Sequence, residues 1–292
     1  MNSSWVWLPL TVFLMASSQH SVPTPARGSD VMLAAVSHDT RMRGTGLGEE
    51  TEKGAAYVEP LARLTPSGEW RSLPCFADRD GKNSADQQNA CSQFEKEYLS
   101  KPHIYTVVSA EGRGATINAA PVRLSECFDY TGKGTYSGAE IRMPAIAASS
   151  TDFFSDSPPP QLLHDAAAMP VLKAFAAAVP GGLDSSSNLT VFSLRLEGQD
   201  LALVQRNYSE PAGKSFKLIF AIGTADRGQF HLLHWKQNTD DEDESVLGTV
   251  HLTNGRDFLI TTVTDPEGQW FRVYGIRQGK LAMVYSGGGS SC

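Results

Sequence analysis

The C-terminal third of the chain is divided into short β-prone runs by closely spaced turn sequences. Asn254-Gly255 separates two such runs, and Asn-Gly favours a type I′ turn whose two central residues need positive φ. Glu197-Gly198 and Gln278-Gly279 divide other runs in the same way. Short connections place sequence neighbours side by side, which favours an antiparallel meander. The predicted strands are 189–196, 201–207, 215–222, 229–235, 246–253, 257–264, 269–276 and 281–285.

Several of these predicted strands carry apolar residues on both faces. In 229–235, Phe230 and Leu232 share one face, while Leu233 and Trp235 lie on the other. A sheet with one face in water would alternate more cleanly. We therefore expect both faces to be covered, by the N-terminal half, by a second layer of the same meander, or by a partner chain.

The predicted fold class is mainly β. We expect the eight-strand antiparallel meander to close as a barrel or to fold as a sandwich. Two propeller blades are the other arrangement of eight strands, but a propeller needs at least about four blades to close a ring. One Ala-rich helix precedes it at about 170–179, where Pro170 suits the first helical turn. Leu172, Phe175 and Val179 would form the buried face of this helix.

The chain before this helix has four predicted parts. Residues 5–17 are apolar but too short to span a bilayer, and small residues follow. This indicates a secretory signal peptide, with an uncleaved anchor as the alternative. The predicted parts are a signal peptide at 1–18, a flexible lead-in at 19–55, an N-terminal β-rich portion at 56–147, and a Pro/Ser-rich connection at 148–161, followed by the helix-plus-meander domain at 162–292.

The N-terminal β-rich portion has its own local signals. A hairpin is predicted from 58–64 and 69–73, with Trp70 as its core residue. A helix is predicted at 84–99, where Phe94 and Tyr98 share a face. Further strands are expected at 103–109, 115–119 and 139–146, while the glycines at 132, 134 and 138 predict a loop.

The chain has four cysteines, Cys75, Cys91, Cys127 and Cys292. An even number in an exported chain indicates two disulfides. Cys75–Cys91 is favoured because a polar segment separates them, and closing a loop of about 15 residues would stabilise by roughly 3 kcal/mol. Cys127–Cys292 follows by elimination; the alternative is a buried thiol and an unpaired end. No CxxC spacing is present, which disfavours thiol exchange and structural zinc.

The charge pattern restricts the kind of partner. The net charge is −7 and no basic stripe is present, so nucleic-acid binding is disfavoured. No motif predicts a cofactor. Thr131–Thr135 lacks the residue spacing of a phosphate-binding loop, and the region around Asp78 lacks the ligand spacing of a calcium-binding loop. The expected partner is an unidentified ligand or protein. No membrane span is expected in the mature chain, which would be secreted or periplasmic.

Three aromatic residues of the meander, Trp235, Trp270 and Tyr274, are the candidate ligand-binding residues. Aromatic side chains give large contact areas with defined geometry. The alternative is ordinary core packing and cross-strand pairing.

Ionisable side chains give weaker candidates. The acidic run 240–244 could attract a cation or basic partner, but it is interpreted as a solvated loop. His231 and His234 would point to opposite faces of a regular strand, and His251 lies on the next predicted strand. His164-Asp165 could suggest a base with its orienting carboxylate, yet sequence neighbours on a helix do not face each other. We predict no metal site from these residues.

Three functions remain open at this point. The first is an exported, non-enzymatic β-rich protein that binds a ligand or protein partner. The second is a secreted hydrolase of unrecognised type that uses carboxylates or a His–Asp pair; two such groups within hydrogen-bond reach in a pocket would favour it. The third is a structural envelope component. The sequence identifies no catalytic residue.

Overall fold

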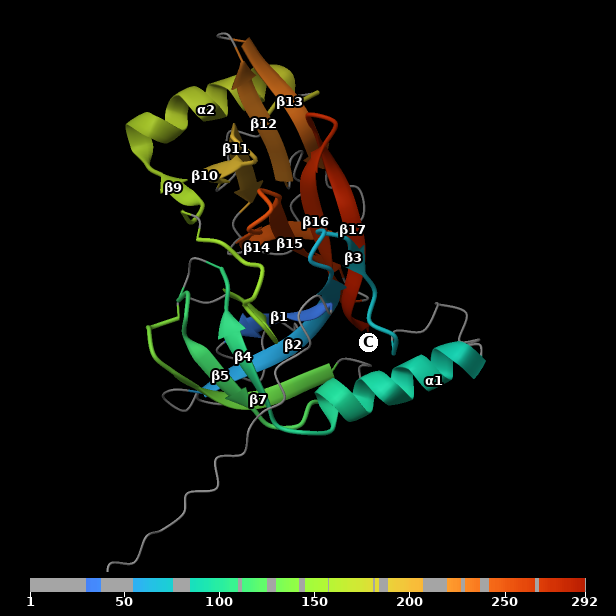
Figure 1. Cartoon of the computed structure of the whole chain (residues 1–292). Coiled ribbons are helices and arrows are strands. Elements are labelled where there is room, and N and C mark those ends of the chain that lie inside the picture. The colour runs from blue at the N-terminus through green and yellow to red at the C-terminus, as the bar shows by residue number, and fades with distance from the viewer. Residues whose placement is uncertain are drawn as a thin grey trace, which may run out of the picture.

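The computed structural model describes residues 30–37, 55–75, 85–109, 112–124, 130–141, 145–156, 158–180, 182–183, 189–206, 220–226, 229–236, 242–265 and 268–291 (Figure 1). The predicted signal peptide, the loop at Asp78, Cys127 and Cys292 lie outside these residues. The described residues are mainly β, as predicted, and they form a stack. A small N-terminal barrel packs on a four-stranded sheet, which packs on a five-stranded sheet covered by a helix.

The N-terminal barrel is a ring of antiparallel strands in the order β2, β1, β8, β4, β5, β7 and back to β2, extended by the two-residue strands β3 and β6. Met32, Val58 and Ile117 are among the side chains that fill its interior. The predicted hairpin of β2 and β3 is confirmed, with Leu64 opposite Trp70. The strands are β1 (Val31–Ser37), β2 (Ala55–Leu64), β3 (Trp70–Arg71), β4 (His103–Val107), β5 (Thr116–Ala119), β6 (Arg123–Leu124), β7 (Tyr130–Ser137) and β8 (Ala145–Ala148).

Strand β1 lies inside the segment predicted as a flexible lead-in, so that prediction is wrong for residues 31–37. β1 pairs with β2 on one side and β8 on the other. Met32 faces the barrel interior, whereas Leu33 packs against the four-stranded sheet outside. Both faces are buried, which explains why the run VMLAAVS shows no apolar–polar alternation.

Strand β7 replaces the predicted glycine-rich loop and closes the barrel, pairing with β5 and with β2. A Cβ on Gly134 would lie 2.8 Å from the carbonyl oxygen of Asn118. Glycine therefore permits a close approach of two backbones here instead of marking a turn. The strand predicted at 139–146 begins later, at Ala145.

All eight predicted strands of the meander are present, in two antiparallel sheets. The five-stranded sheet has the order β13-β12-β11-β10-β9, and the four-stranded sheet runs from β14 to β17. The sheets share one core that includes Leu203, Ile222 and Leu259, so the meander folds as a sandwich. The strands are β9 (Gln161–Leu163), β10 (Leu189–Leu196), β11 (Gln199–Arg206), β12 (Phe220–Asp226), β13 (Gln229–Lys236), β14 (Asp243–His251), β15 (Asp257–Asp265), β16 (Gly268–Arg277) and β17 (Lys280–Ser291).

Both sheets of the sandwich are covered on both faces, as predicted. Leu203 and Val204 are neighbours on β11 and are both fully buried, Leu203 between the sheets and Val204 beneath the helix. Leu259 and Ile260 on β15 are likewise buried on opposite faces, the second against the barrel. The cover comes from the same chain on each side.

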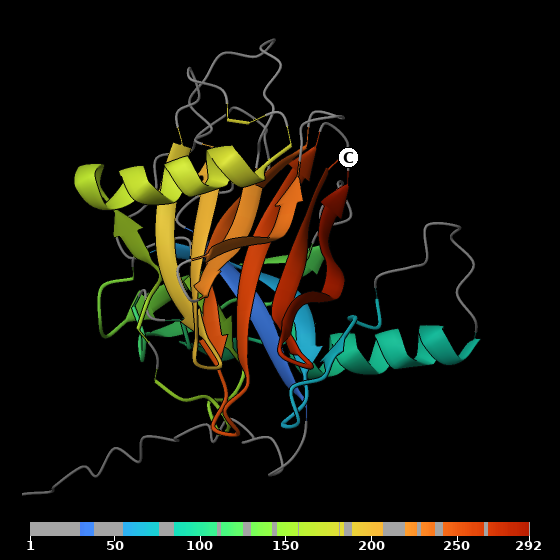
Figure 2. The same cartoon turned by 90° about the horizontal axis from the view of Figure 1, so that it is seen from above.

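Helix α2 (Asp165–Ala178) lies across the five-stranded sheet (Figure 2). Phe175 and Val179 are buried and Leu172 partly buried in its contact with the sheet, as predicted. The predicted helix start is wrong, because Pro170 lies inside the helix. Its ring costs one backbone hydrogen bond, and the packing of this apolar face offsets that loss.

Two hairpin turns have positive φ at both central residues, as a type I′ turn requires. Glu197 and Gly198 have φ of 45° and 81°, and Gln278 and Gly279 have φ of 52° and 74°. The type I′ turn predicted at Asn254-Gly255 is wrong, because only Gly255 has positive φ there. The Gly255 N–H donates to the Leu252 carbonyl. The loop between β14 and β15 is therefore longer than two residues and contains Gly255 in the left-handed backbone conformation.

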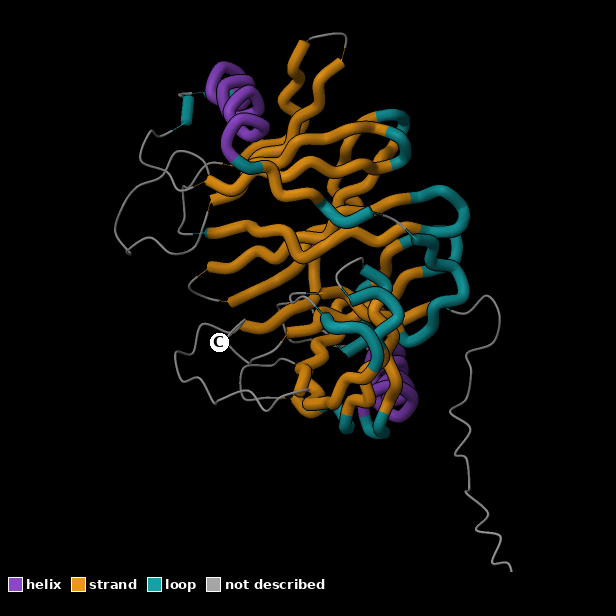
Figure 3. Tube along the Cα trace, turned by 90° about the vertical axis from the view of Figure 1, so that its left-hand side faces the viewer, coloured by secondary structure: helices purple, strands orange, loops and turns teal. Residues whose placement is uncertain are grey.

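The two halves of the chain share a core. Phe153 and Phe154, from the connection between them, pack with barrel and sheet residues, and Phe154 forms a bridge with Leu252. Strand β17 lies against β2, and the Tyr285 hydroxyl donates to the Leu61 carbonyl at 3.4 Å. Figure 3 shows the two helices at opposite ends of the molecule.

Candidate functional site

The structure does not bring the three predicted aromatic residues together. Trp235 packs with the cluster beneath α2. Tyr274 is 1% exposed and belongs to the core between the two sheets, on the other side of the five-stranded sheet. Trp270 is partly buried, with the Arg272 guanidinium 5.8 Å from its ring centre. These rings therefore form no common surface.

The acidic run is not simply a solvated loop, and that interpretation is wrong for Glu242–Glu244. Asp243 and Glu244 begin β14, and the Glu244 side chain is fully buried between the sheets. Its carboxylate accepts hydrogen bonds from the Thr261 hydroxyl at 2.7 Å, the Tyr274 hydroxyl at 2.7 Å and the Arg272 guanidinium at 2.8 Å. A buried charge requires such partners, which the two neighbouring strands provide.

Two groups beside Glu244 have shifted pKa values. Burial, and then the nearby Glu244 charge, raise the pKa of Tyr274 far above its ordinary value. Burial lowers the pKa of His234, whose Nε2 lies 3.3 Å from the Tyr274 hydroxyl. Tyr274 therefore stays protonated, and its hydroxyl donates a hydrogen bond to the Glu244 carboxylate. The three hydrogen bonds to Glu244 join strands β14, β15 and β16 of the four-stranded sheet, and the contact between Tyr274 and His234 extends the network to β13 of the other sheet.

A His–Asp pair lies at another corner of the sandwich. His251 Nδ1 is 2.7 Å from the Asp257 carboxylate, and the other Asp257 oxygen accepts the Glu197 N–H at 2.5 Å. His251 Nε2 is buried and has no hydrogen-bond partner in the part of the chain that the structure describes. The predicted pair His164-Asp165 lies elsewhere, at the start of α2, where His164 is exposed.

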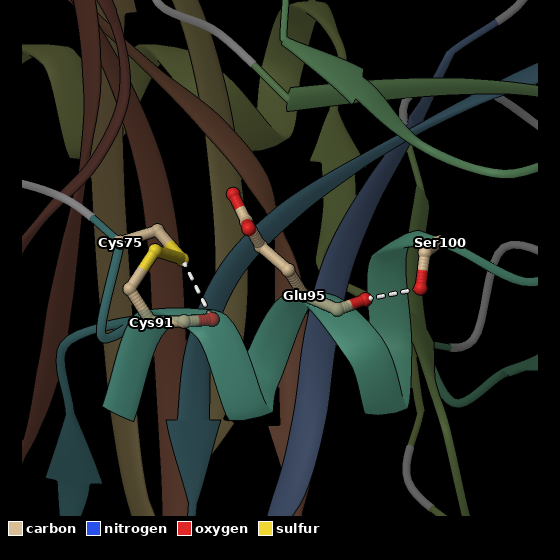
Figure 4. Close-up of a disulfide and its surroundings, with 4 residues drawn as sticks. All are labelled: Cys75, Cys91, Glu95 and Ser100. Carbon is tan, nitrogen blue, oxygen red and sulfur yellow. Dashed lines mark hydrogen bonds between the residues drawn. A yellow bond between two sulfur atoms is a disulfide. The ribbon is translucent and has the colours of Figure 1, made fainter. Parts of the chain in front are cut away.

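A cavity lies beside the barrel, between the first helix and the β2–β3 hairpin. α1 (Ala85–Phe94) continues into a π-helical turn (Glu95–Leu99), which ends where Ser100 donates its N–H and hydroxyl to the Glu95 carbonyl (Figure 4). The cavity has a volume of about 690 Å³. It is lined by Asp30, Arg63, Ser72, Leu73, Pro74, Gln87, Ala90, Gln93, Phe94, Glu97 and Tyr98. We refer to it as the α1 cleft.

The predicted disulfide Cys75–Cys91 is confirmed and lies next to this cleft (Figure 4). It joins the segment after β3 to the middle of α1, with the two Cα atoms 4.6 Å apart. Among the described residues, Cys75, Cys91 and Glu95 are the one group of ligand-type side chains close enough to hold a metal. The two sulfurs are bonded to each other, so the group offers only a carboxylate.

Around Tyr98 lie three buried polar atoms that have no hydrogen-bond partner among the described residues. They are Arg63 Nε, His103 Nε2 and the Tyr105 hydroxyl. The Tyr98 ring packs 5.7 Å from that of His103, which lies 5.0 Å from that of Tyr105. Buried polar atoms are nearly always paired, and exceptions commonly mark a place for water or a ligand. Burial and the nearby Glu97 raise the pKa of Tyr98 to about 12, so its hydroxyl remains protonated.

Sequence reasoning did not identify the residues of the α1 cleft. Asp30, Arg63 and Glu97 are distant in the chain and form no motif. The contact between Phe94 and Tyr98, with ring centres 5.2 Å apart, was predicted, and so was the disulfide. Both features lie at one wall of the cleft, but neither indicated that a cleft is present or that this wall faces β2. Among the described residues, no helix has the length and apolar character needed to cross a membrane. No family model matches the chain, and neither does any curated protein or solved structure.

Proposed function

We propose that this is an exported, non-enzymatic protein that binds a small polar molecule in the α1 cleft. The observation that carries the proposal is the cleft itself. Its volume of about 690 Å³ lies in the range of small-molecule sites. Polar side chains dominate its lining, and one of them is the cationic guanidinium of Arg63.

Rigidity supports a binding role for the cleft. The disulfide fixes α1 at Cys91, one turn from Glu95, and the hairpin wall rests on the barrel through Leu73. A preformed site loses less conformational entropy on binding than a flexible one. Export is supported by the apolar segment 5–17 and by the disulfide, since such bonds persist in oxidising compartments. Sequencing the N-terminus of the natural protein tests the export step.

Blocking the cleft tests the binding step. Ala90 lines the cleft and is exposed, so Ala90→Trp would fill the cleft without disturbing the core. Ala177→Trp, on the exposed face of α2, is the matched control. Both variants would be titrated by saturation-transfer NMR with a panel of amino acids, sugars and organic acids. We expect at least one compound to bind the parent and Ala177→Trp but not Ala90→Trp. A panel in which every bound compound also binds Ala90→Trp would refute the proposal.

A secreted hydrolase is the second candidate, favoured by one observation. The pair His251–Asp257 has a carboxylate at 2.7 Å from Nδ1 and a free Nε2, the arrangement of a general base with its orienting group. Nε2 is buried, which does not suit contact with a substrate. Hydrolysis of ester, glycoside or peptide substrates that His251→Gln abolishes would support this candidate. Activity that survives the substitution would exclude this pair.

A further inference from the structure

The two arginines beside the α1 cleft differ in how their hydrogen-bonding groups are used. Arg71 donates to Asp30 at 3.2 Å and to Glu69 at 2.9 Å, so its guanidinium lies between two carboxylates. Arg63 lines the cleft, and its Nη2 donates only a long hydrogen bond, 3.5 Å, to the Ser72 carbonyl. Its Nε is buried and makes no hydrogen bond with the described residues, so a ligand in the cleft would meet the Nη atoms.

An arginine in this condition is suited to an anion. The guanidinium presents parallel N–H groups that match the two oxygens of a carboxylate, and it cannot lose its charge. Asp30 is already engaged by Arg71 and therefore leaves Arg63 available. Glu97 and Asp30 still contribute negative charge around the cleft, which disfavours a doubly charged phosphate more than a carboxylate.

The remaining lining is suited to uncharged polar groups. The Tyr98 hydroxyl, whose proton is directed at Glu97, can accept a hydrogen bond, and the amides of Gln87 and Gln93 can donate or accept them. The rings of Phe94 and Tyr98 provide an apolar wall. The cleft thus combines the cationic guanidinium group of Arg63 with hydrogen-bonding groups on the opposite wall.

We infer that the α1 cleft takes a small organic acid, whose carboxylate is held by Arg63 and whose hydroxyl or amide groups contact the α1 wall. This inference rests on the proposed binding function of the cleft, and it specifies the ligand class. It assigns to Arg63 the role of the residue that selects acids over their neutral analogues.

Matched probe pairs test the inference. The full-length protein would be titrated by NMR with glucuronate against glucose, and with N-acetylglycine against N-acetylglycinamide, up to about 10 mM, a range that detects weak binding. In each pair the probes share a polar body and differ in the carboxylate. We expect the acid of at least one pair to bind tenfold or more tightly than its neutral partner. Equal binding of both members, or no binding by any probe, would overturn the assignment.

Two arginine variants locate the carboxylate. Arg63→Gln should abolish the preference for the acid. Arg63→Lys keeps the positive charge but loses the pair of parallel N–H donors, so it should retain part of that preference. Arg195→Gln is the control and should retain the preference within about threefold, because Arg195 lies on β10 of the sandwich, is 64% exposed and does not line the cleft. Far-ultraviolet circular dichroism would confirm that each variant is folded. A preference that survives Arg63→Gln would refute the role of Arg63.

The combination with Ala90→Trp separates the two proposals. If the tryptophan abolishes binding of both members of a pair while Arg63→Gln changes neither, the cleft is the site and the carboxylate assignment is wrong. If the tryptophan leaves acid binding intact, the cleft itself is wrong as the binding site.

Discussion

Truncating Glu244 should be one of the most destabilising single changes in the sandwich. The Glu244 side chain is fully buried and accepts three hydrogen bonds, from Thr261, Tyr274 and Arg272. Glu244→Ala removes the acceptor of all three and leaves the Arg272 guanidinium without this partner. Breaking a buried ion pair from one side costs about 3–5 kcal/mol. Arg272 remains 18% exposed, so water relieves part of this cost and we expect a loss of about 3 kcal/mol.

Urea denaturation at neutral pH measures this loss, read as the shift of the midpoint at an unchanged slope. The control is Glu69→Ala, which breaks an ion pair with Arg71 whose side chains are 61% and 45% exposed; exposed pairs of this kind contribute about 0–1 kcal/mol. The double variant Glu244→Ala with Arg272→Ala should be less destabilised than the sum of the single variants, because it also removes the Arg272 charge that Glu244→Ala leaves without its closest carboxylate. A loss below about 1 kcal/mol for Glu244→Ala, no larger than that of the control, would refute the reasoning.

Three further predictions concern the barrel and the cleft. Replacing both Cys75 and Cys91 by serine should cost about 3 kcal/mol by the loop-closure argument for residues 16 apart, measured by denaturation of the variant beside the oxidised parent. Tyr98 is protonated in the folded protein up to a pKa of about 12, above its ordinary value of 10.0, so its contribution to stability is present below pH 10 and is lost as the pH rises through 12. Tyr98→Phe should therefore make the stability between pH 10 and 12 less dependent on pH, and an unchanged pH profile in the denaturation midpoints would contradict this. Gly134→Ala should lower the free energy of unfolding by about 1–3 kcal/mol, because the new methyl group would meet the Asn118 carbonyl oxygen; an unchanged melting temperature would show that the two strands can separate.

Most of the sandwich could be predicted because its signals are local. Positive φ at Gly198 and Gly279 depends on the turn residues themselves, and the two-residue period of a strand depends on its own side chains. The β1 and β7 errors have the opposite cause. β1 is buried on two faces and so has no alternation, while Gly134 is required by a neighbouring backbone that the local sequence does not encode.

The α1 cleft was predictable only in part. Pairing Cys75 with Cys91 and placing Tyr98 on the face of Phe94 required only short separations along the chain. The approach of Arg63 and Asp30 to that wall depends on how the barrel closes, which involves contacts between distant strands. The same limit applies to the acidic run, where the sequence shows five adjacent carboxylates but not which one is buried.

The sequence by itself determined the β class, the positions of the turns, the two-sided burial of the meander and one disulfide. Each of these depends on backbone dihedral angles or side-chain periodicity over a few residues. The tertiary structure alone decided that Glu244 is buried beside Arg272 and that Arg63 faces the α1 cleft. Coulombic and hydrogen-bond energies depend on distance in space, and in an antiparallel fold that distance is set by which strands pair and which faces meet.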